Sequence, residues 1–403
     1  MWWSRLFYEL FLPKGYPHSV SSDYINYQIW DSIQALASSV MMAVSMTASF
    51  QGYGVGDKNV SVYASTLTWL FKDGIGMIGK ISFAWYLSSN VNVKTWRLMA
   101  DICNDASFIV EMMIPKFLNS RFVIPIIFGF GGLLRAIVSI AGGASRAMIA
   151  QHQAKSDNIA DILAKDNSQE VLVNLIALFC NFVIISVFLQ HQYIRAETVL
   201  VVCLIIHLYS NYMLVRSINL DTINLTRMAM LCERYATALI SGENLSNIRG
   251  FDIQSINTNE PLFYKLPWIL NNLKIAQTES FTDKQKESLR VQLLSSTAAG
   301  VYDDVTFCIV LTPNFKSVDL LRECGQFCFL NISLNWGGNK LYKFQEAAQH
   351  IKESITSSQK SIDKFFKILE QNRWNLDKTD FEIGPIRHDR NLNVIKHMHS
   401  KED

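Results

Sequence analysis

Long runs without a charged residue alternate with short polar segments over the first half of the chain. The clearest run, Val171–Ile194, contains no Asp, Glu, Lys or Arg. A helix that spans a membrane needs about 20 mostly apolar residues, because the hydrocarbon layer is about 30 Å thick and a helix rises about 1.5 Å per residue. A buried core helix is the alternative explanation of one such run, but core helices seldom stay uncharged for this length. Further predicted spans are Thr198–Val215, Ser32–Gly56 and Phe122–Ala150, with weaker candidates in Val60–Phe71, Ile75–Ser88 and Phe108–Leu118.

The pattern changes after Arg216. Apolar residues then recur at helical spacing from Ile223 to about Ile240, which predicts an amphipathic helix that leaves the membrane or lies along it. The predicted fold is mainly α: a polytopic helical membrane domain over residues 1–235, a connecting segment over 236–284, and a small soluble α+β domain over 285–403. Predicted elements near and within this last domain are a strand at Thr306–Leu311, helices at Val318–Phe329 and Leu341–Gln371, and a short strand at Phe381–Ile383.

The distribution of charge supports this division. Residues 1–230 hold 16 Lys or Arg and 14 Asp or Glu, whereas the shorter remainder holds 21 of each kind. The net charge of +2 argues against a nucleic-acid-binding protein, which usually carries a basic surface. The first residues lack the long apolar core and small-residue cleavage site of a signal peptide. We therefore expect a multi-pass membrane protein, and the sequence leaves its organelle open.

Seven cysteines are scattered through apolar surroundings and form no CxxC pair, which indicates buried free thiols rather than a zinc site. The chain contains no GxSxG, GxxxxGK[ST] or HExxH motif, so we expect neither an enzyme nor a bound cofactor. His152 is the most suggestive histidine, but a single histidine without ligand partners is more often structural.

Ionisable residues inside a membrane segment usually face a bundle interior, a partner or a water-filled cavity. Arg135, Ser139, Gly142 and Arg146 are spaced by four, three and four residues and so share one helical stripe. If the helix runs on, Asp157, Asp161 and Lys165 extend the stripe, and Glu170, Asn174 and Asn181 share a face of the next span. These residues form a polar path or anion site, or the arginines simply pair with Asp157, Asp161 or Glu170 or reach the membrane interface.

Two short sequence patterns add to this picture. Lys72-Asp73 and Lys165-Asp166 occur in similar surroundings, and an internal repeat would place all four at helix ends facing a shared cavity. Gly74–Gly79 matches GxGxxG, but its apolar surroundings favour close helix packing over a dinucleotide site. The candidate ligand-binding residues are Arg135, Ser139, Arg146, His152, Asp157, Asp161, Lys165, Asp166, Glu170, Lys72 and Asp73.

Several longer motifs resemble a known family. They are FLPKGYP (11–17), YQIWDS (27–32), TWLFKDG (68–74), WRL (96–98), GASR (143–146), QHQA (151–154), DNIAD (157–161) and AKDNSQE (164–170). Over roughly residues 11–235 the chain is similar to the root UV-B sensitive family. That family typically has Gly-Gly-Ala-Thr-Arg where this chain has Gly-Gly-Ala-Ser-Arg at 142–146, so a hydroxyl is retained. The resemblance implies a link to vitamin B6 balance, early seedling development, UV-B responses and auxin transport in plants, with no established biochemical activity, and it implies that two members can act together.

Two functions compete on this basis. The first is a transporter-like protein for an anionic small molecule, and the second is a membrane-anchored scaffold that recruits partners through residues 285–403. A lipid-modifying enzyme ranks third, because no nucleophile and base occur at a recognisable spacing. The expected partners are the lipid bilayer, an anionic small molecule, and another family member or a second copy of the chain, with no nucleic acid.

Overall fold

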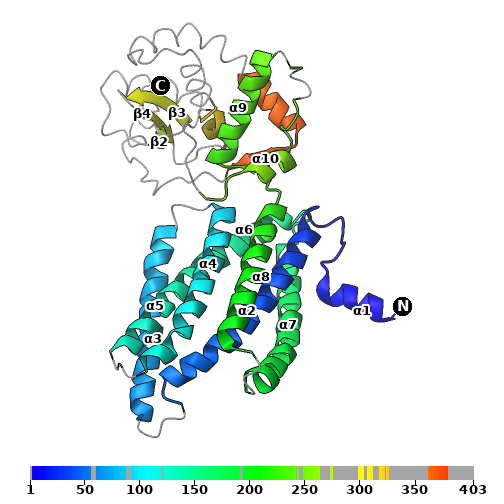
Figure 1. Ribbon diagram of the computed structural model, residues 1–403. Coiled ribbons are helices and arrows are strands. Elements are labelled where there is room, and N and C mark those ends of the chain that lie inside the picture. The colour runs from blue at the N-terminus through cyan, green and yellow to red at the C-terminus, as the bar shows by residue number, and fades with distance from the viewer. Residues whose placement is uncertain are drawn as a thin grey trace, which may run out of the picture. The chain divides into compact units, whose positions relative to one another are not determined.

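The computed structural model forms two compact units, Met1–Ile218 and Asn219–Asp403, which are described separately (Figure 1). Helices dominate the first unit and a few strands occur in the second, so the predicted mainly α fold is confirmed. The residues that the structure describes are 2–55, 60–87, 92–118, 120, 122–190, 194–241, 243–244, 248–263, 273–275, 298–303, 306–311, 317–322, 324–325 and 362–379.

The first unit is built from long helices joined by short connections (Figure 1). Helix α2 packs against α4, α7 and α8, and α5 packs against α3 and α4. Two π-helical segments continue α5 and α7, as often occurs where a helix adjusts its register. The elements are α1 (Trp2–Phe11), α2 (Tyr24–Gly52), α3 (Val62–Leu87), α4 (Val93–Met112), η1 (Ile114–Phe117), α5 (Val123–Ile137), η2 (Val138–Gly142), α6 (Gly143–Gln153), α7 (Ile159–Val183), η3 (Ile184–Leu189) and α8 (Ala196–Ser217).

The first unit exposes apolar side chains and buries charged ones. Phe122, Trp85 and Phe182 are 87%, 82% and 73% exposed, whereas Asp105 and Glu111 are buried. A protein surrounded by water usually shows the opposite distribution. Among the described residues, four helical stretches are long and apolar enough to cross a membrane: Tyr24–Gly52, Val123–Gln153, Ile159–Leu189 and Ala196–Ser217. They coincide with the four main predicted spans, while the weaker candidates lie on α3, α4 and η1.

The polar face predicted on Ile159–Leu189 packs against α2. Asn174 Oδ1 accepts a hydrogen bond of 2.6 Å from the Ser39 hydroxyl, and Asn181 Nδ2 donates one of 3.3 Å to the Ser39 carbonyl oxygen. Two amides of α7 therefore bind one residue of α2. Since amide groups are costly in hydrocarbon, these bonds determine which face of α7 turns inward.

The GxGxxG stretch lies within the continuous helix α3, and its last glycine, Gly79, packs closely against α5. A Cβ atom added to Gly132 of α5 would lie 2.8 Å from the carbonyl oxygen of Lys72, and one added to Gly79 would lie 3.0 Å from the Cβ of Ala136. Such distances require small residues at the helix interface. The helix-packing interpretation of this motif is therefore confirmed.

The predicted continuation of the arginine stripe past Gln153 is wrong. Helix α6 ends at Gln153 and α7 begins at Ile159. Between them Ala154 is extended and forms a β-bridge with Val20, and Asp157 adopts a positive φ of 53°. This backbone conformation is unfavourable in a helix, so Asp157, Asp161 and Lys165 do not prolong the face that carries Arg135 and Arg146.

The second unit buries an apolar core around the helix predicted near residues 223–240. That helix, α9 (Leu225–Ser241), packs Met228, Leu231 and Tyr235 against Phe251 and Phe365. The predicted membrane domain included this helix up to residue 235, whereas the structure groups it with the C-terminal residues. The remaining elements are β1 (Thr222–Ile223), α10 (Ile253–Asn259), β2 (Leu273–Ile275), β3 (Ala298–Asp303), β4 (Thr306–Leu311) and β5 (Asn375–Thr379).

The described part of this unit contains two small sheets. Strand β4 pairs in parallel with β2 and antiparallel with β3, and β1 pairs in parallel with β5. The predicted strand Thr306–Leu311 is confirmed as β4, and helical residues occur at 317–322, 324–325 and 362–371 within the two predicted helices. The predicted strand Phe381–Ile383, and much of the connecting segment and of domain 285–403, lie outside the described residues.

Candidate functional site

Arg135 forms an ion pair with Glu111 of α4, which lies in the weaker span candidate Phe108–Leu118. Its Nη2 donates a hydrogen bond of 2.7 Å to Glu111 Oε2, and Lys72 Nζ donates one of 2.8 Å to Glu111 Oε1. We call Lys72, Glu111 and Arg135 the Glu111 cluster. The side chain of Glu111 is 3% exposed, and those of Lys72 and Arg135 are 21% and 34% exposed. Two cations thus share one buried carboxylate, which leaves a formal charge of +1.

Aromatic rings and glycines surround the Glu111 cluster. Lys72 Nζ lies 5.2 Å from the ring centroid of Phe128, and the Arg135 guanidinium lies 5.3 Å from that of Phe108. Cations are attracted to such ring faces. Tyr53 stacks on Phe128 with centroids 4.3 Å apart. The two cations of the cluster therefore lie against a set of packed aromatic rings.

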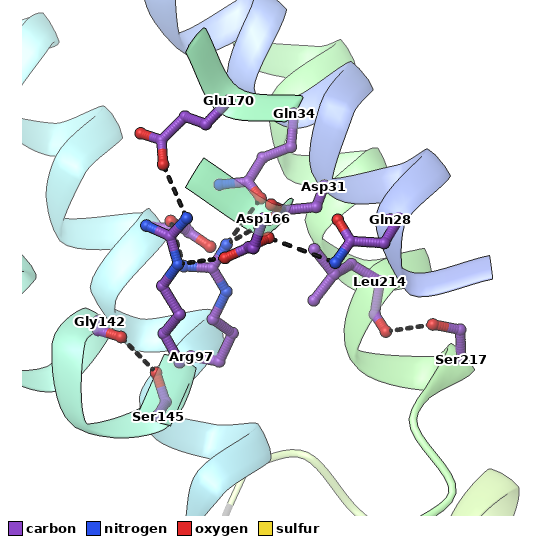
Figure 2. A network of polar contacts seen from close by, with 12 residues as sticks. Gln28, Asp31, Gln34, Arg97, Gly142, Ser145, Asp166, Glu170, Leu214 and Ser217 are labelled. Atoms are coloured by element: carbon purple, nitrogen blue, oxygen red, sulfur yellow. Dashed lines mark hydrogen bonds and ion pairs between the residues drawn. The ribbon is translucent and has the colours of Figure 1, made fainter. Parts of the chain in front are cut away.

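Arg146 binds two acidic residues of α7. Its Nε donates to Asp166 Oδ2, and its Nη2 lies 2.8 Å from Glu170 Oε2. Asp166 also accepts a hydrogen bond of 3.3 Å from Gln28 of α2 (Figure 2). Of the alternatives drawn from the sequence, pairing of this arginine with Glu170 is therefore confirmed, while Asp157 and Asp161 are not its partners. Because the two carboxylates outnumber the guanidinium, this group offers an incoming anion no surplus positive charge.

A second arginine lies beside this group. Figure 2 shows Arg97 pointing toward Asp31, Gln34 and Asp166. Arg97 Nη2 donates to Asp31 Oδ1 at 2.7 Å and to Gln34 Oε1 at 3.1 Å, and its Nη1 lies 3.8 Å from Asp101 Oδ1. The acidic residues of α2, α4 and α7 thus enclose two guanidinium groups. Such a network ties these helices to one another in one arrangement.

The other motif residues hold the N-terminal segment against α6 and α7. His152 Nε2 lies 3.1 Å from Asp23 Oδ2, and Asp161 Oδ2 accepts a 2.7 Å hydrogen bond from the backbone N–H of Lys14. Lys165 Nζ donates to the carbonyl oxygen of Glu9 at 2.6 Å. The motifs FLPKGYP and DNIAD, which are distant in sequence, are therefore in direct contact. These three candidates fix the fold of the N-terminal segment.

The candidate residues do not form one site. Arg135 with Lys72, Arg146 with Asp166 and Glu170, and Asp161 with Lys165 belong to three separate groups. Ser139, Asp157 and Asp73 are exposed. The predicted placement of Lys72-Asp73 and Lys165-Asp166 at helix ends is wrong, because the pairs lie within α3 and α7. Lys72 binds the buried carboxylate of Glu111 on α4, whereas Lys165 binds a backbone carbonyl. The expected shared cavity is therefore not formed by these four residues.

Sequence reasoning missed the charged face of α4. Arg97, Asp101 and Asp105 follow one another at intervals of four residues, and Glu111 lies on the same helix. All three acids are buried. Their spacing in an otherwise apolar stretch was the available signal, since ionisable residues in membrane segments tend to face the interior. The missed partners of α4 are Asp31 and Gln34 on α2 and His207 on α8.

Comparison with known proteins identifies the family. A family model described as the vitamin B6 photo-protection and homoeostasis domain matches residues 1–238, which is more than half of the chain. The protein called root UVB sensitive 3 from Arabidopsis thaliana is 33% identical over 343 residues, covering 80% of this chain and 74% of its own length. This chain belongs to the root UVB sensitive (RUS) family. The family resemblance seen in the motifs is thereby confirmed.

Two further RUS proteins show how the similarity is distributed. RUS family member 1 from Dictyostelium discoideum is 42% identical over 231 residues, which cover 56% of this chain and 43% of that protein. Root UVB sensitive 5 from Arabidopsis thaliana is 22% identical over 95% of this chain and 76% of its own length. The chain thus spans less than half of the Dictyostelium relative. No solved structure matches the chain.

Proposed function

We propose that residues 1–218 form a multi-pass membrane bundle that binds and transports a small anionic metabolite, without catalysing its conversion. The observation that carries this proposal is the surplus positive charge of the Glu111 cluster. Lys72 and Arg135 share a single carboxylate. A charge that is out of bulk water is costly without compensation, so an anion is the natural additional partner.

Arg135 has the capacity to bind such an anion. A guanidinium carries five N–H donors in a planar fork suited to phosphate and carboxylate. Nη2 is occupied by Glu111, while Nε makes no hydrogen bond to any residue that the structure describes. Nε is itself buried, but the side chain as a whole is one-third exposed, so a ligand can reach the guanidinium from its exposed side. Arg146 is less suited to this role, because two carboxylates already occupy its guanidinium.

The membrane part of the proposal rests on the distribution of side chains in the first unit. The four long apolar helices expose large hydrophobic residues, and the ion pairs lie among the helices. A bilayer places the same demands on a protein, since apolar surface can face lipid while charged groups need partners inside the bundle. The family description supports a phosphorylated vitamin B6 compound as the first anion to test.

The experiment uses the full chain in lipid nanodiscs, with thermal stability measured against increasing pyridoxal 5′-phosphate. Arg135→Gln and Lys72→Gln each leave Glu111 with one cation, so both variants keep a balanced internal pair and should fold. Each should weaken binding about tenfold or more, because a hydrogen bond to a charged group contributes about 1.5–3 kcal/mol. Arg195→Gln is the matched control, since Arg195 is exposed before α8 and its loss removes the same charge.

Pyridoxal without phosphate and inorganic phosphate separate recognition of the ring from recognition of the anion. Equal stabilisation of Arg135→Gln and of the unmodified chain contradicts the assigned site. If no anion stabilises the unmodified chain, the transport proposal is overturned. The scaffold alternative then gains support if deletion of residues 285–403 abolishes function while Arg135→Gln leaves it intact.

A further inference from the structure

A second group of polar side chains lies between α4 and α8, apart from the anion site proposed above. His207 Nδ1 lies 2.8 Å from Asp105 Oδ1, and the two side chains are 0% and 4% exposed. One helical turn farther along α8, Asn211 is also completely buried. Neither polar atom of its amide makes a hydrogen bond to any described residue.

The packing of the two helices places a further acid at the level of this amide. Phe108 of α4 lies in one apolar cluster with Leu200 and Leu204 of α8, so the helices run antiparallel with Asp105 at the level of His207. One turn from this contact along each helix, Asp101 and Asn211 fall at the same level. Asp101 is buried, and its Oδ2 has no hydrogen bond within the described part of the chain.

The buried polar side chains around Asp105 carry more negative than positive charge. Asp31 on α2 and Asp101 on α4 share one guanidinium, that of Arg97, and Asp105 follows Asp101 one helical turn later on α4. At the opposite end, beyond Asp105, the apolar side chains of Met41, Phe108 and Leu200 pack together. Buried carboxylates in such surroundings either bind a cation or take up a proton, because an isolated negative charge there is strongly unfavourable.

We infer that Asp105 and His207 form a buried proton-binding dyad, with the Asn211 amide and Asp101 as the polar groups that accommodate its change of charge. An imidazole in contact with a carboxylate can hold the proton on either partner, and histidine is the side chain that titrates most readily near neutral pH. The dyad joins α4 to α8, so the proton it binds affects the contact between two helices of the bundle. Under the proposed transport function, on which this step rests, the proton accompanies the anion.

Infrared titration of the full chain in detergent tests the dyad without any anion. The unmodified chain should show a carboxyl group that titrates together with a histidine ring band, and Asp105→Asn should remove that carboxyl signal. Asp377→Asn is the control, because Asp377 is an exposed acid of the second unit whose loss should leave the signal unchanged. In His207→Gln, Asp105 should stay protonated to a pH about one unit higher or more, because no imidazolium then stabilises the carboxylate.

An Asp105→Asn spectrum identical to that of the unmodified chain overturns the inference. If Asp105→Asn does not fold, the His207→Gln spectrum decides the question, and an unchanged carboxyl titration there counts against the dyad. In a last measurement, the infrared titration is repeated with sodium chloride in place of choline chloride at constant ionic strength. Loss of the titration in sodium alone identifies a cation site in place of the proton dyad.

Discussion

Glu111 of α4 accepts a 2.7 Å hydrogen bond from Arg135 of α5. The Glu111 side chain is 3% exposed, whereas that of Arg135 is 34% exposed. The buried partner is the acid, and the accessible partner is the cation. Because Lys72 binds the other oxygen of the same carboxylate, Glu111 is the internal counter-ion of both cations. Removal of the Glu111 carboxylate therefore distinguishes whether Lys72 and Arg135 stabilise the fold or bind a ligand.

Replacement of Glu111 by Gln should lower stability and strengthen anion binding at the same time. The neutral amide leaves Lys72 and Arg135 without their charged partner, at an expected cost of about 1–3 kcal/mol, since both cations can partly rehydrate. The same loss frees two cations for a ligand. Thermal unfolding in detergent, with and without pyridoxal 5′-phosphate, measures both effects. A destabilised variant with weakened anion affinity would argue that Glu111 itself contacts the ligand or that the site lies elsewhere.

Replacement of Gly132 by Ala should separate α3 from α5 and destabilise the first unit. The new Cβ would meet the carbonyl oxygen of Lys72 at 2.8 Å, and a backbone atom cannot move away as a flexible side chain does. Over-packing of this kind costs about 1–3 kcal/mol. Gly74→Ala is the matched control on α3, since nothing lies within 4 Å of its added Cβ. That change should be neutral or add about 0.5–1 kcal/mol, because alanine favours a helix. Equal effects of the two changes in a thermal unfolding assay contradict the close packing of these helices.

Replacement of Glu260 by Gln should destabilise the second unit strongly. Glu260 Oε2 lies 3.0 Å from Arg227 Nε, both side chains are 1% exposed, and Glu260 Oε1 accepts a 2.7 Å hydrogen bond from Asn224. Removal of one partner of a buried ion pair typically costs about 3–5 kcal/mol. Asp363→Asn provides the comparison, because the Arg322–Asp363 pair is 36% and 52% exposed and should contribute at most about 1 kcal/mol. Hydrogen exchange of α9 reports on both variants, and similar protection in the two would contradict the burial of the Arg227–Glu260 pair.

Asp252 should make the stability of α10 depend on pH. Burial slightly opposes its charge, but hydrogen bonds from Ser255, including one of 2.8 Å from its backbone N–H, lower the pKa of Asp252 below its usual value. Its contribution is therefore present above the pKa of the unfolded chain and is lost as the pH falls through the lower folded value. Asp252→Ala should cost about 1 kcal/mol at neutral pH and much less in acid. Hydrogen exchange of residues 253–259 at both pH values measures this difference, and a cost that stays constant with pH would exclude a role for the charge.

The four long apolar helices and strand β4 could be predicted from the sequence, because both depend on local properties. The charge-free run Val171–Ile194 is long enough for a helix to cross the hydrocarbon layer. The residues of TFCIVL (306–311) favour a strand whichever strand they pair with. The GxGxxG stretch was also interpreted correctly, since its apolar neighbours are incompatible with a nucleotide-binding turn. Likewise, Cys103 is a buried free thiol, as its apolar surroundings indicated.

The sequence determined by itself which segments are apolar enough for a membrane and which residues share a helical face, because helix geometry fixes those relations within one segment. Only the tertiary structure decided which acid each arginine meets. Arg135 binds Glu111, 24 residues earlier, and Arg146 binds Asp166, 20 residues later, across helix contacts that the spacing of residues does not specify. The turn at Asp157 likewise depends on a bridge between Val20 and Ala154, which are distant in sequence. Val171–Ile194 thus predicted a span and its polar face, whereas the tertiary structure decided that this face packs against α2.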